Sequence, residues 1–153
     1  MPLDLVREHA LGKARSVAAQ AHGRPVLGVD TAVVLDGLVY GKPATAAEAV
    51  EMLENLGGRT HEVVSGLCLL GPGWEAVEHE ITRVSFRPFA RQDVAAYVAT
   101  GEWEGRAGAY AIQGRGAALV ERIEGDYLNV VGLPAALLVR TLAERMPGAY
   151  GFG

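Results

Sequence analysis

The residues best suited to chemistry stand where strands and loops are expected to meet. Asp30 and Thr31 follow a short apolar run, Lys42 precedes a proline, and Gln113 is followed by a glycine that would let a ligand approach the backbone. A carboxylate at a strand end can act as a general base or hold a hard metal ion. Lys42, and Lys13 in the first expected helix, can neutralise phosphate charge, while a glutamine amide can hold a phosphate or the edge of a ring. Together these residue types indicate a phosphate or metal site.

Each of these residues also has an ordinary structural explanation. An aspartate at a strand end often forms a turn, and a lysine before a proline is commonly a solvated loop residue. Gln113 can satisfy the backbone of its own loop, and Lys13 can be a surface charge on its helix. The residue types alone therefore leave both interpretations open.

The histidines and the cysteine add no metal site to this set. No two of the four His stand at metal-ligand spacing. His61 lies in a strand-like run, where a structural role is expected, and His9, His22 and His79 are weaker candidates still. The single cysteine, Cys68, excludes an internal disulfide and is expected to be a small buried residue.

Length and charge limit the class of protein and its partners. The 153 residues suit one domain, 1–153, since domains commonly have about 100–200 residues. Lys+Arg number 14 against 18 Asp+Glu, and the net charge of −4 argues against a protein that holds nucleic acid. No apolar run approaches the roughly 20 residues that cross a bilayer, and charges near the start argue against a signal peptide. We therefore expect a cytoplasmic protein with no nucleic-acid or membrane partner.

In the first half of the chain, the sequence predicts two helices that flank a strand and a hairpin. Apolar spacings of three and four predict the first helix over 5–21. Thr45 and Glu48 have the spacing of a capping box for the second helix, which ends at Gly57-Gly58. Asp36-Gly37 is a strong hairpin signal, because both turn positions need a positive φ. The strand-like runs before and after this turn are 26–29, which continues into Asp30 and Thr31, 33–35 and 38–40.

In the second half, the sequence predicts a long hairpin, a glycine-rich loop and two more helices. Gly71-Pro72-Gly73 joins two long strands, and Gly125-Asp126 is a second hairpin candidate. Glycines throughout 101–116 predict an ordered loop. The expected strands are 60–70, 74–86 and 117–123, and the expected helices are 93–99 and a last one from Pro134 to Leu142. This order predicts an α/β, more narrowly a mixed α+β, fold: a mixed sheet with helices on its faces.

Several sequence runs, taken together, resemble one family. In chain order they are GVDTAVVLDG, YGKP before a capped helix, GRTHEVVSG, VSFRPF, AGAYAIQGRG and EGDYLNVVGLP. They closely resemble the Maf family of nucleoside triphosphate pyrophosphatases over residues 5–142, nearly the whole chain. The resemblance implies the inosine-triphosphatase-like fold, with a mixed twisted sheet, helices on its faces and a central cleft.

The resemblance also implies a reaction and a role for each candidate residue. The reaction is hydrolysis of a nucleoside triphosphate to the monophosphate and pyrophosphate with a divalent metal cation, Mg²⁺ or Mn²⁺. Asp30 would activate water or hold the metal, and Lys13 and Lys42 would contact phosphates. Thr31 and Gln113 match positions tied to substrate choice, and their identities resemble the branch that acts on dTTP, UTP and modified pyrimidine analogues.

This chain departs from the family pattern in two ways. In one loop, Arg106 stands where the family commonly has lysine, which keeps the charge and changes its shape, and Ala111 stands where it commonly has glycine. The chain also begins at a helix that family members reach only after a strand and a Ser-x-Ser-Pro-Arg-Arg loop, so we expect an N-terminally truncated domain. A missing strand exposes a sheet edge, and we expect a homodimer. Two hypotheses follow: an active dTTP/UTP pyrophosphatase, or a catalytically impaired chain that binds nucleotides or serves as an interaction subunit.

Overall fold

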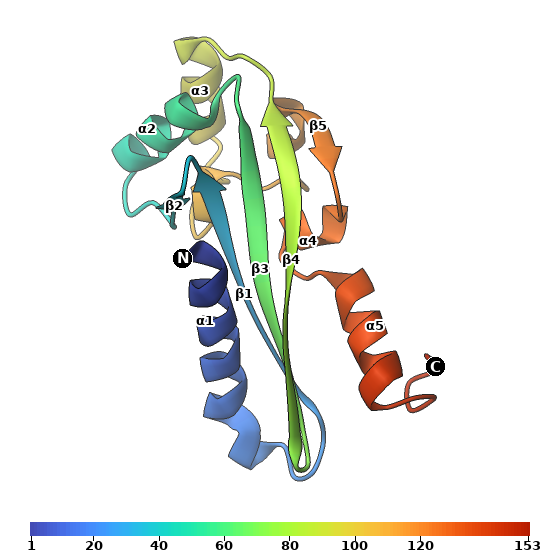
Figure 1. Ribbon diagram of the computed structural model, residues 1–153. Coiled ribbons are helices and arrows are strands. Elements are labelled where there is room, and N and C mark those ends of the chain that lie inside the picture. Colours follow the sequence, from blue (N-terminus) through green and yellow to red (C-terminus); the bar gives the residue numbers. More distant parts are fainter.

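A five-stranded sheet runs through the computed structural model, which describes residues 1–153 (Figure 1). The spatial order of the strands is β2-β1-β3-β4-β5, and every pairing is antiparallel. The strands are β1 (Val26–Leu35), β2 (Leu38–Tyr40), β3 (Thr60–Gly71), β4 (Trp74–Phe86) and β5 (Val120–Glu124). The mixed α+β class expected from the sequence is confirmed, and the sheet itself contains antiparallel pairs only.

Five helices pack against this sheet. Helix α1 lies along one face of β1 and β3, while α2 and α3 pack on each other at one end of the sheet (Figure 1). On the opposite side from α1, α4 contacts β3 and β4, and α5 contacts β4. Their bounds are α1 (Pro2–Val17), α2 (Ala46–Leu56), α3 (Arg91–Val98), α4 (Tyr127–Val131) and α5 (Ala135–Arg145). None of them has the length and apolar character that crossing a membrane requires.

The local signals in the first half of the chain are confirmed. Asp36 and Gly37 join β1 to β2 with φ angles of 51° and 77°, the left-handed values that this hairpin turn requires. The Thr45 hydroxyl accepts a hydrogen bond from the Glu48 N–H at 3.2 Å and so caps α2. The Glu48 carboxylate reaches back to the N–H of Ala44, at 2.7 Å, one residue before the cap.

Two expectations in the second half are wrong. Residues Ala117–Leu119 belong to a 3₁₀ turn, Arg115–Leu119, so the strand expected from 117 starts at Val120. Gly125-Asp126 forms no hairpin, because the Asp126 carboxylate accepts the Leu128 N–H at 2.8 Å and caps α4. A helix as short as α4 shows too little apolar periodicity to be recognised in the sequence.

Helix α1 packs on the sheet with almost no space between the two backbones. Its apolar stripe, Val6, Ala10 and Ala14, is fully buried. A Cβ at Gly28 of β1 would overlap the Ala10 carbonyl, and one at Gly66 of β3 would overlap the Val6 carbonyl. Both strands therefore need glycine where the helix crosses them.

We predict that Gly66→Ala destabilises the protein by about 1–3 kcal/mol, because the added methyl group forces α1 away from β3. Gly12→Ala is the matched control: it lies in α1 with open space around it, and the same substitution there is expected to stabilise by about 1 kcal/mol. Urea unfolding monitored by circular dichroism measures both. Equal stability of the two variants would contradict the proposed packing constraint.

Candidate functional site

One cavity of about 240 Å³ brings together all five residues singled out in the sequence. It is lined from α1, from β1, from the loop after β2, from the glycine-rich segment 105–113 and from the end of α4. The five residues on its wall are Lys13, Asp30, Thr31, Lys42 and Gln113. Segments that are far apart in the sequence therefore converge on one site.

The cavity lies at an edge of β1 that no strand covers. One side of β1 pairs with β3. On its other side, β2 pairs only with Val33–Leu35, so the residues of β1 before Val33 form a free edge of the sheet. Neighbouring residues of a strand point to opposite faces, yet Asp30 and Thr31 both line the cavity. Both can do so because the cavity wraps around this open edge, where the two faces meet.

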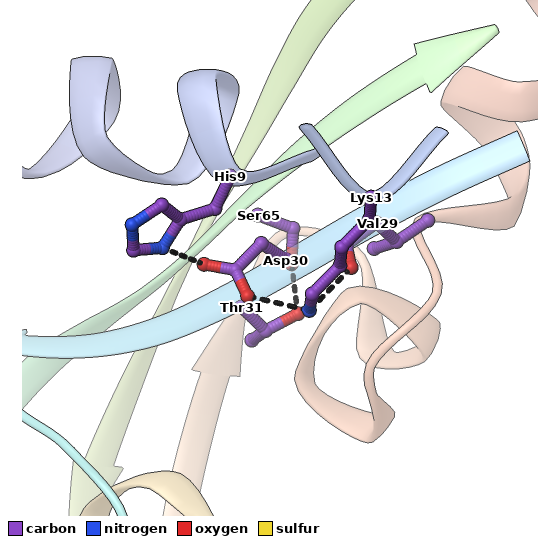
Figure 2. Close-up of polar contacts among 6 residues, drawn as sticks. All are labelled: His9, Lys13, Val29, Asp30, Thr31 and Ser65. Atoms are coloured by element: carbon purple, nitrogen blue, oxygen red, sulfur yellow. Dashed lines mark hydrogen bonds and ion pairs between the residues drawn. The ribbon is translucent and has the colours of Figure 1, made fainter. Parts of the chain in front are cut away.

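Two side chains of α1 hold the Asp30 carboxylate (Figure 2). Lys13 Nζ lies 2.7 Å from Oδ1 and also donates to the Val29 carbonyl at 3.0 Å. His9 Nδ1 lies 3.1 Å from Oδ2. Because a carboxylate only accepts, the hydrogen of this contact is on His9 Nδ1. His9 was a weak candidate in the sequence, although its spacing of four from Lys13 places both on one helix face.

Thr31 is hydrogen-bonded to a serine, Ser65, that the sequence analysis did not single out. Thr31 Oγ1 and Ser65 Oγ are 2.8 Å apart across the β1–β3 ladder, in which the two residues are direct partners. Ser65 is fully buried, whereas Thr31 is half-buried and lines the cavity. A residue that lines the cavity is therefore held through its hydroxyl by a residue that does not line it.

The charged residues around the cavity are mostly cations. Lys13, Lys42 and Arg106 line it with a single carboxylate, Asp30, so its wall carries a net charge of +2 on a chain whose net charge is −4. Of the three cations only Lys13 is in an ion pair. Lys42 and Arg106 therefore remain available to an anion, and Arg106 is a wall residue known from the sequence only as a departure from the family pattern.

The glycine-rich segment that carries Gln113 is an ordered loop, as expected, and one carboxylate anchors it. Glu102 accepts the N–H groups of Arg115 and Gly116 at 2.9 and 3.2 Å. These backbone hydrogen bonds, that of Arg115 foremost, hold the pKa of Glu102 below its usual value. At the other end of the loop, the Gly108 N–H donates to the Gly41 carbonyl at 3.1 Å, next to Lys42. The loops that carry Gln113 and Lys42 are thus tied together.

The wall behind the loop contains a buried His–Tyr pair. Tyr110 lines the cavity, and its hydroxyl lies 2.7 Å from His61 Nε2, with Phe86 packed edge-on against both rings. Burial lowers the pKa of His61 to about 4, so the imidazole is neutral at pH 7. The structural role expected for His61 fits this position, as burial fits Cys68.

Helix α4, which the sequence analysis missed, closes the remaining side. Its Asn129 is fully buried and donates to the Val63 carbonyl and the Thr82 hydroxyl, both at 3.1 Å. These bonds fasten α4 to β3 and β4, and the residues that follow, Val130–Gly132, form part of the cavity wall. In the sequence, Asn129 would have indicated a buried polar contact only if the helix that carries it had been recognised.

Comparison with known proteins identifies similar chains. The family model described as Maf-like protein matches residues 1–145. The dTTP/UTP pyrophosphatase of Symbiobacterium thermophilum is 51% identical over 143 residues, which are 94% of this chain and 74% of that protein. The enzymes of the same name from Nitratidesulfovibrio vulgaris and Bacillus cytotoxicus are 52% and 45% identical, over 92% and 97% of this chain and 67% and 78% of their own lengths.

We predict that His61 makes stability depend on pH below neutrality. The unfolded chain binds a proton at His61 near pH 6.5, but the folded chain binds it only near pH 4, so the free energy of unfolding falls as the pH falls between these values. The loss reaches about 3 kcal/mol and then levels off. His61→Gln should lose this contribution.

Urea unfolding from pH 7.5 to pH 4 tests this expectation. The exposed His79→Gln is the matched control and should keep the pH dependence of the unaltered protein. Identical pH dependence in His61→Gln and in the unaltered protein would show that His61 titrates normally.

Proposed function

The chain belongs to the Maf-like protein family, and from that premise we propose that it hydrolyses dTTP and UTP to the monophosphate and pyrophosphate. The proposal extends to their modified pyrimidine analogues and places the activity in the cytoplasm. The observation that carries it is the convergence of Lys13, Lys42 and Arg106 with one carboxylate, Asp30, in a cavity of net charge +2. The names of the similar enzymes support the same reaction.

The charge of the cavity suits a polyphosphate. A nucleoside triphosphate carries about four negative charges, and more charge develops on the leaving group as the anhydride bond breaks. Lys42 and Arg106, which are in no ion pair, would bind phosphate oxygens. The Arg106 guanidinium can bind two oxygens of one phosphate at once. Lys13 would share its charge between the phosphates and Asp30, which it contacts at 2.7 Å.

Asp30 is the proposed catalytic residue. Its carboxylate is the only one on the cavity wall, and His9 and Lys13 each hold one of its oxygens. In the proposal Asp30 accepts a proton from the attacking water or holds a divalent cation. Thr31 and Gln113 supply a hydroxyl and an amide that can read the edge of the base.

A divalent cation, Mg²⁺ or Mn²⁺, is part of the proposal. No group of three or more His, Cys, Asp and Glu side chains gathers in the structure, so the chain offers Asp30 alone at this site. Mg²⁺ is commonly held by one or two carboxylates together with the phosphates of a substrate, and Asp30 fits that donor chemistry. Such an ion would offset the charge that develops on the phosphates.

The alternative is a catalytically impaired chain that binds nucleotides or serves as an interaction subunit. One observation favours it: both oxygens of Asp30 already accept hydrogen bonds from this chain's own side chains. These contacts take two of the four acceptor positions of the carboxylate, so fewer remain for water or a metal ion. Measured turnover separates the two functions.

We predict that the protein releases pyrophosphate from dTTP and UTP with Mg²⁺ or Mn²⁺, and that Asp30→Asn lowers kcat by at least about 100-fold, because it removes the only carboxylate of the cavity. Asp36→Asn is the matched control: it makes the same change in an exposed turn with a positive φ, which asparagine tolerates. An enzyme-coupled pyrophosphate assay across a panel of triphosphates measures the rates. Turnover no higher than that of Asp30→Asn would favour the alternative.

We also propose a homodimer, which the open edge of β1 favours. The start of this edge, which precedes the residues that line the cavity, lacks a neighbouring strand, and Leu27 on it is 41% exposed. Sedimentation is expected to give twice the monomer mass. Leu27→Lys should weaken association by placing a charge on this edge, whereas Leu133→Lys, at a residue 38% exposed elsewhere, should not. A monomer at all concentrations would refute the dimer.

A further inference from the structure

The Thr31–Ser65 pair has a direction that the cavity imposes on it. The two hydroxyl oxygens lie 2.8 Å apart, and each hydroxyl carries one hydrogen, so either could be the donor (Figure 2). Their surroundings differ. Ser65 is fully buried on β3 and absent from the cavity wall, whereas Thr31 on β1 is half-buried and lines the cavity.

Only one direction satisfies both hydroxyl groups. Ser65 Oγ has Thr31 Oγ1 as its one hydrogen-bond partner, so its hydrogen has no other acceptor. If Thr31 were the donor, the Ser65 hydrogen would be buried without a partner, a state that costs about 1–3 kcal/mol. If Ser65 is the donor, the Thr31 hydrogen turns away from it and can be satisfied in the cavity. The buried serine therefore leaves the Thr31 hydrogen free to be donated to a ligand.

We infer that Ser65 is a specificity-determining residue, because through Thr31 it selects a base that presents a hydrogen-bond acceptor. This inference rests on the proposed function. Uracil and thymine carry a carbonyl oxygen, O4, where cytosine carries an amino group, which can only donate at that position. The Thr31 hydrogen is satisfied by the carbonyl. Opposite the amino group, Thr31 could only accept with its second lone pair, and its own hydrogen would lack this partner. The inference therefore predicts that the protein prefers UTP and dTTP over CTP.

A role of Ser65 in specificity can be distinguished from a general effect on folding, because only the former changes the ratio of activity on UTP to activity on CTP. Ser65→Ala frees the Thr31 hydroxyl to turn either way, and the ratio of kcat/KM for UTP to that for CTP is expected to fall about tenfold, the value of one hydrogen bond. Ser65→Thr keeps the hydroxyl and should keep the ratio. A purely structural defect would lower the rates for UTP and CTP in parallel.

The chain contains a matched control for this substitution. Thr60 and Ser85 form the same kind of cross-strand hydroxyl pair, also at 2.8 Å, on an exposed part of β3 and β4 outside the cavity wall. Ser85→Ala should leave the UTP-to-CTP ratio unchanged. In a Thr31→Val background, Ser65→Ala should have no further effect on the ratio, because its influence passes through the Thr31 hydroxyl.

Dissociation constants of UTP and CTP, measured by calorimetry without divalent cation, complete the test. The same preference for UTP in binding, again reduced about tenfold by Ser65→Ala, would support the inference even in a chain without turnover, and the absence of turnover would then refute only the proposed hydrolysis. The inference is overturned if Ser65→Ala leaves the ratio unchanged, whether both affinities stay the same or both fall in parallel, as with a structural defect or with a phosphate or sugar oxygen opposite Thr31. It is also overturned if the unaltered protein binds both nucleotides equally or binds neither.

Discussion

The close packing of α1 on the glycines of β1 and β3 is the contact on which the site depends. Because Gly28 and Gly66 lack a Cβ, the helix backbone lies directly on the sheet. The side of α1 that carries His9 and Lys13 then reaches the open edge of β1, where each binds one oxygen of Asp30. The geometry of the carboxylate is thus set by a backbone contact between residues that carry no catalytic group themselves.

A second constraint is the concentration of positive charge in an acidic chain. Three cations and one carboxylate share the cavity wall, although acidic residues outnumber basic ones in the chain as a whole. They come from α1, β1 and two loops, and a hydrogen bond between Gly108 and Gly41 ties the loops together. The acidic surface repels anions at a distance, so an anion is held only where this local field overcomes it. The proposed binding of a polyphosphate thus depends on the local convergence of charge and not on the overall charge.

Much of the fold and most of the candidate site could be predicted from the sequence, because short-range chemistry determined them. Asp36-Gly37 formed its hairpin and Thr45 capped α2, since each motif satisfies its own backbone. The expectations that failed were the ones that tertiary contacts decide. Asp126 became the cap of a five-residue helix that Asn129 fastens to the sheet, where the sequence suggested a turn between strands. His9 looked unimportant because its partner, Asp30, lies far along the chain and meets it only across a strand edge.

The sequence alone determined the types of the reactive groups. They are a carboxylate after a strand, lysines, a threonine and a glutamine, in runs that resemble one family. Residue type and order decide which atoms can accept a proton or neutralise a phosphate, because these are properties of single side chains. Direction and partnership were decided by the folded molecule alone. Asp30 and Thr31 line one cavity because β1 has an open edge there, and the Thr31 hydroxyl is paired with Ser65 because the two residues are partners across β1 and β3. Burial and strand pairing join residues distant in the chain, and no local pattern records them.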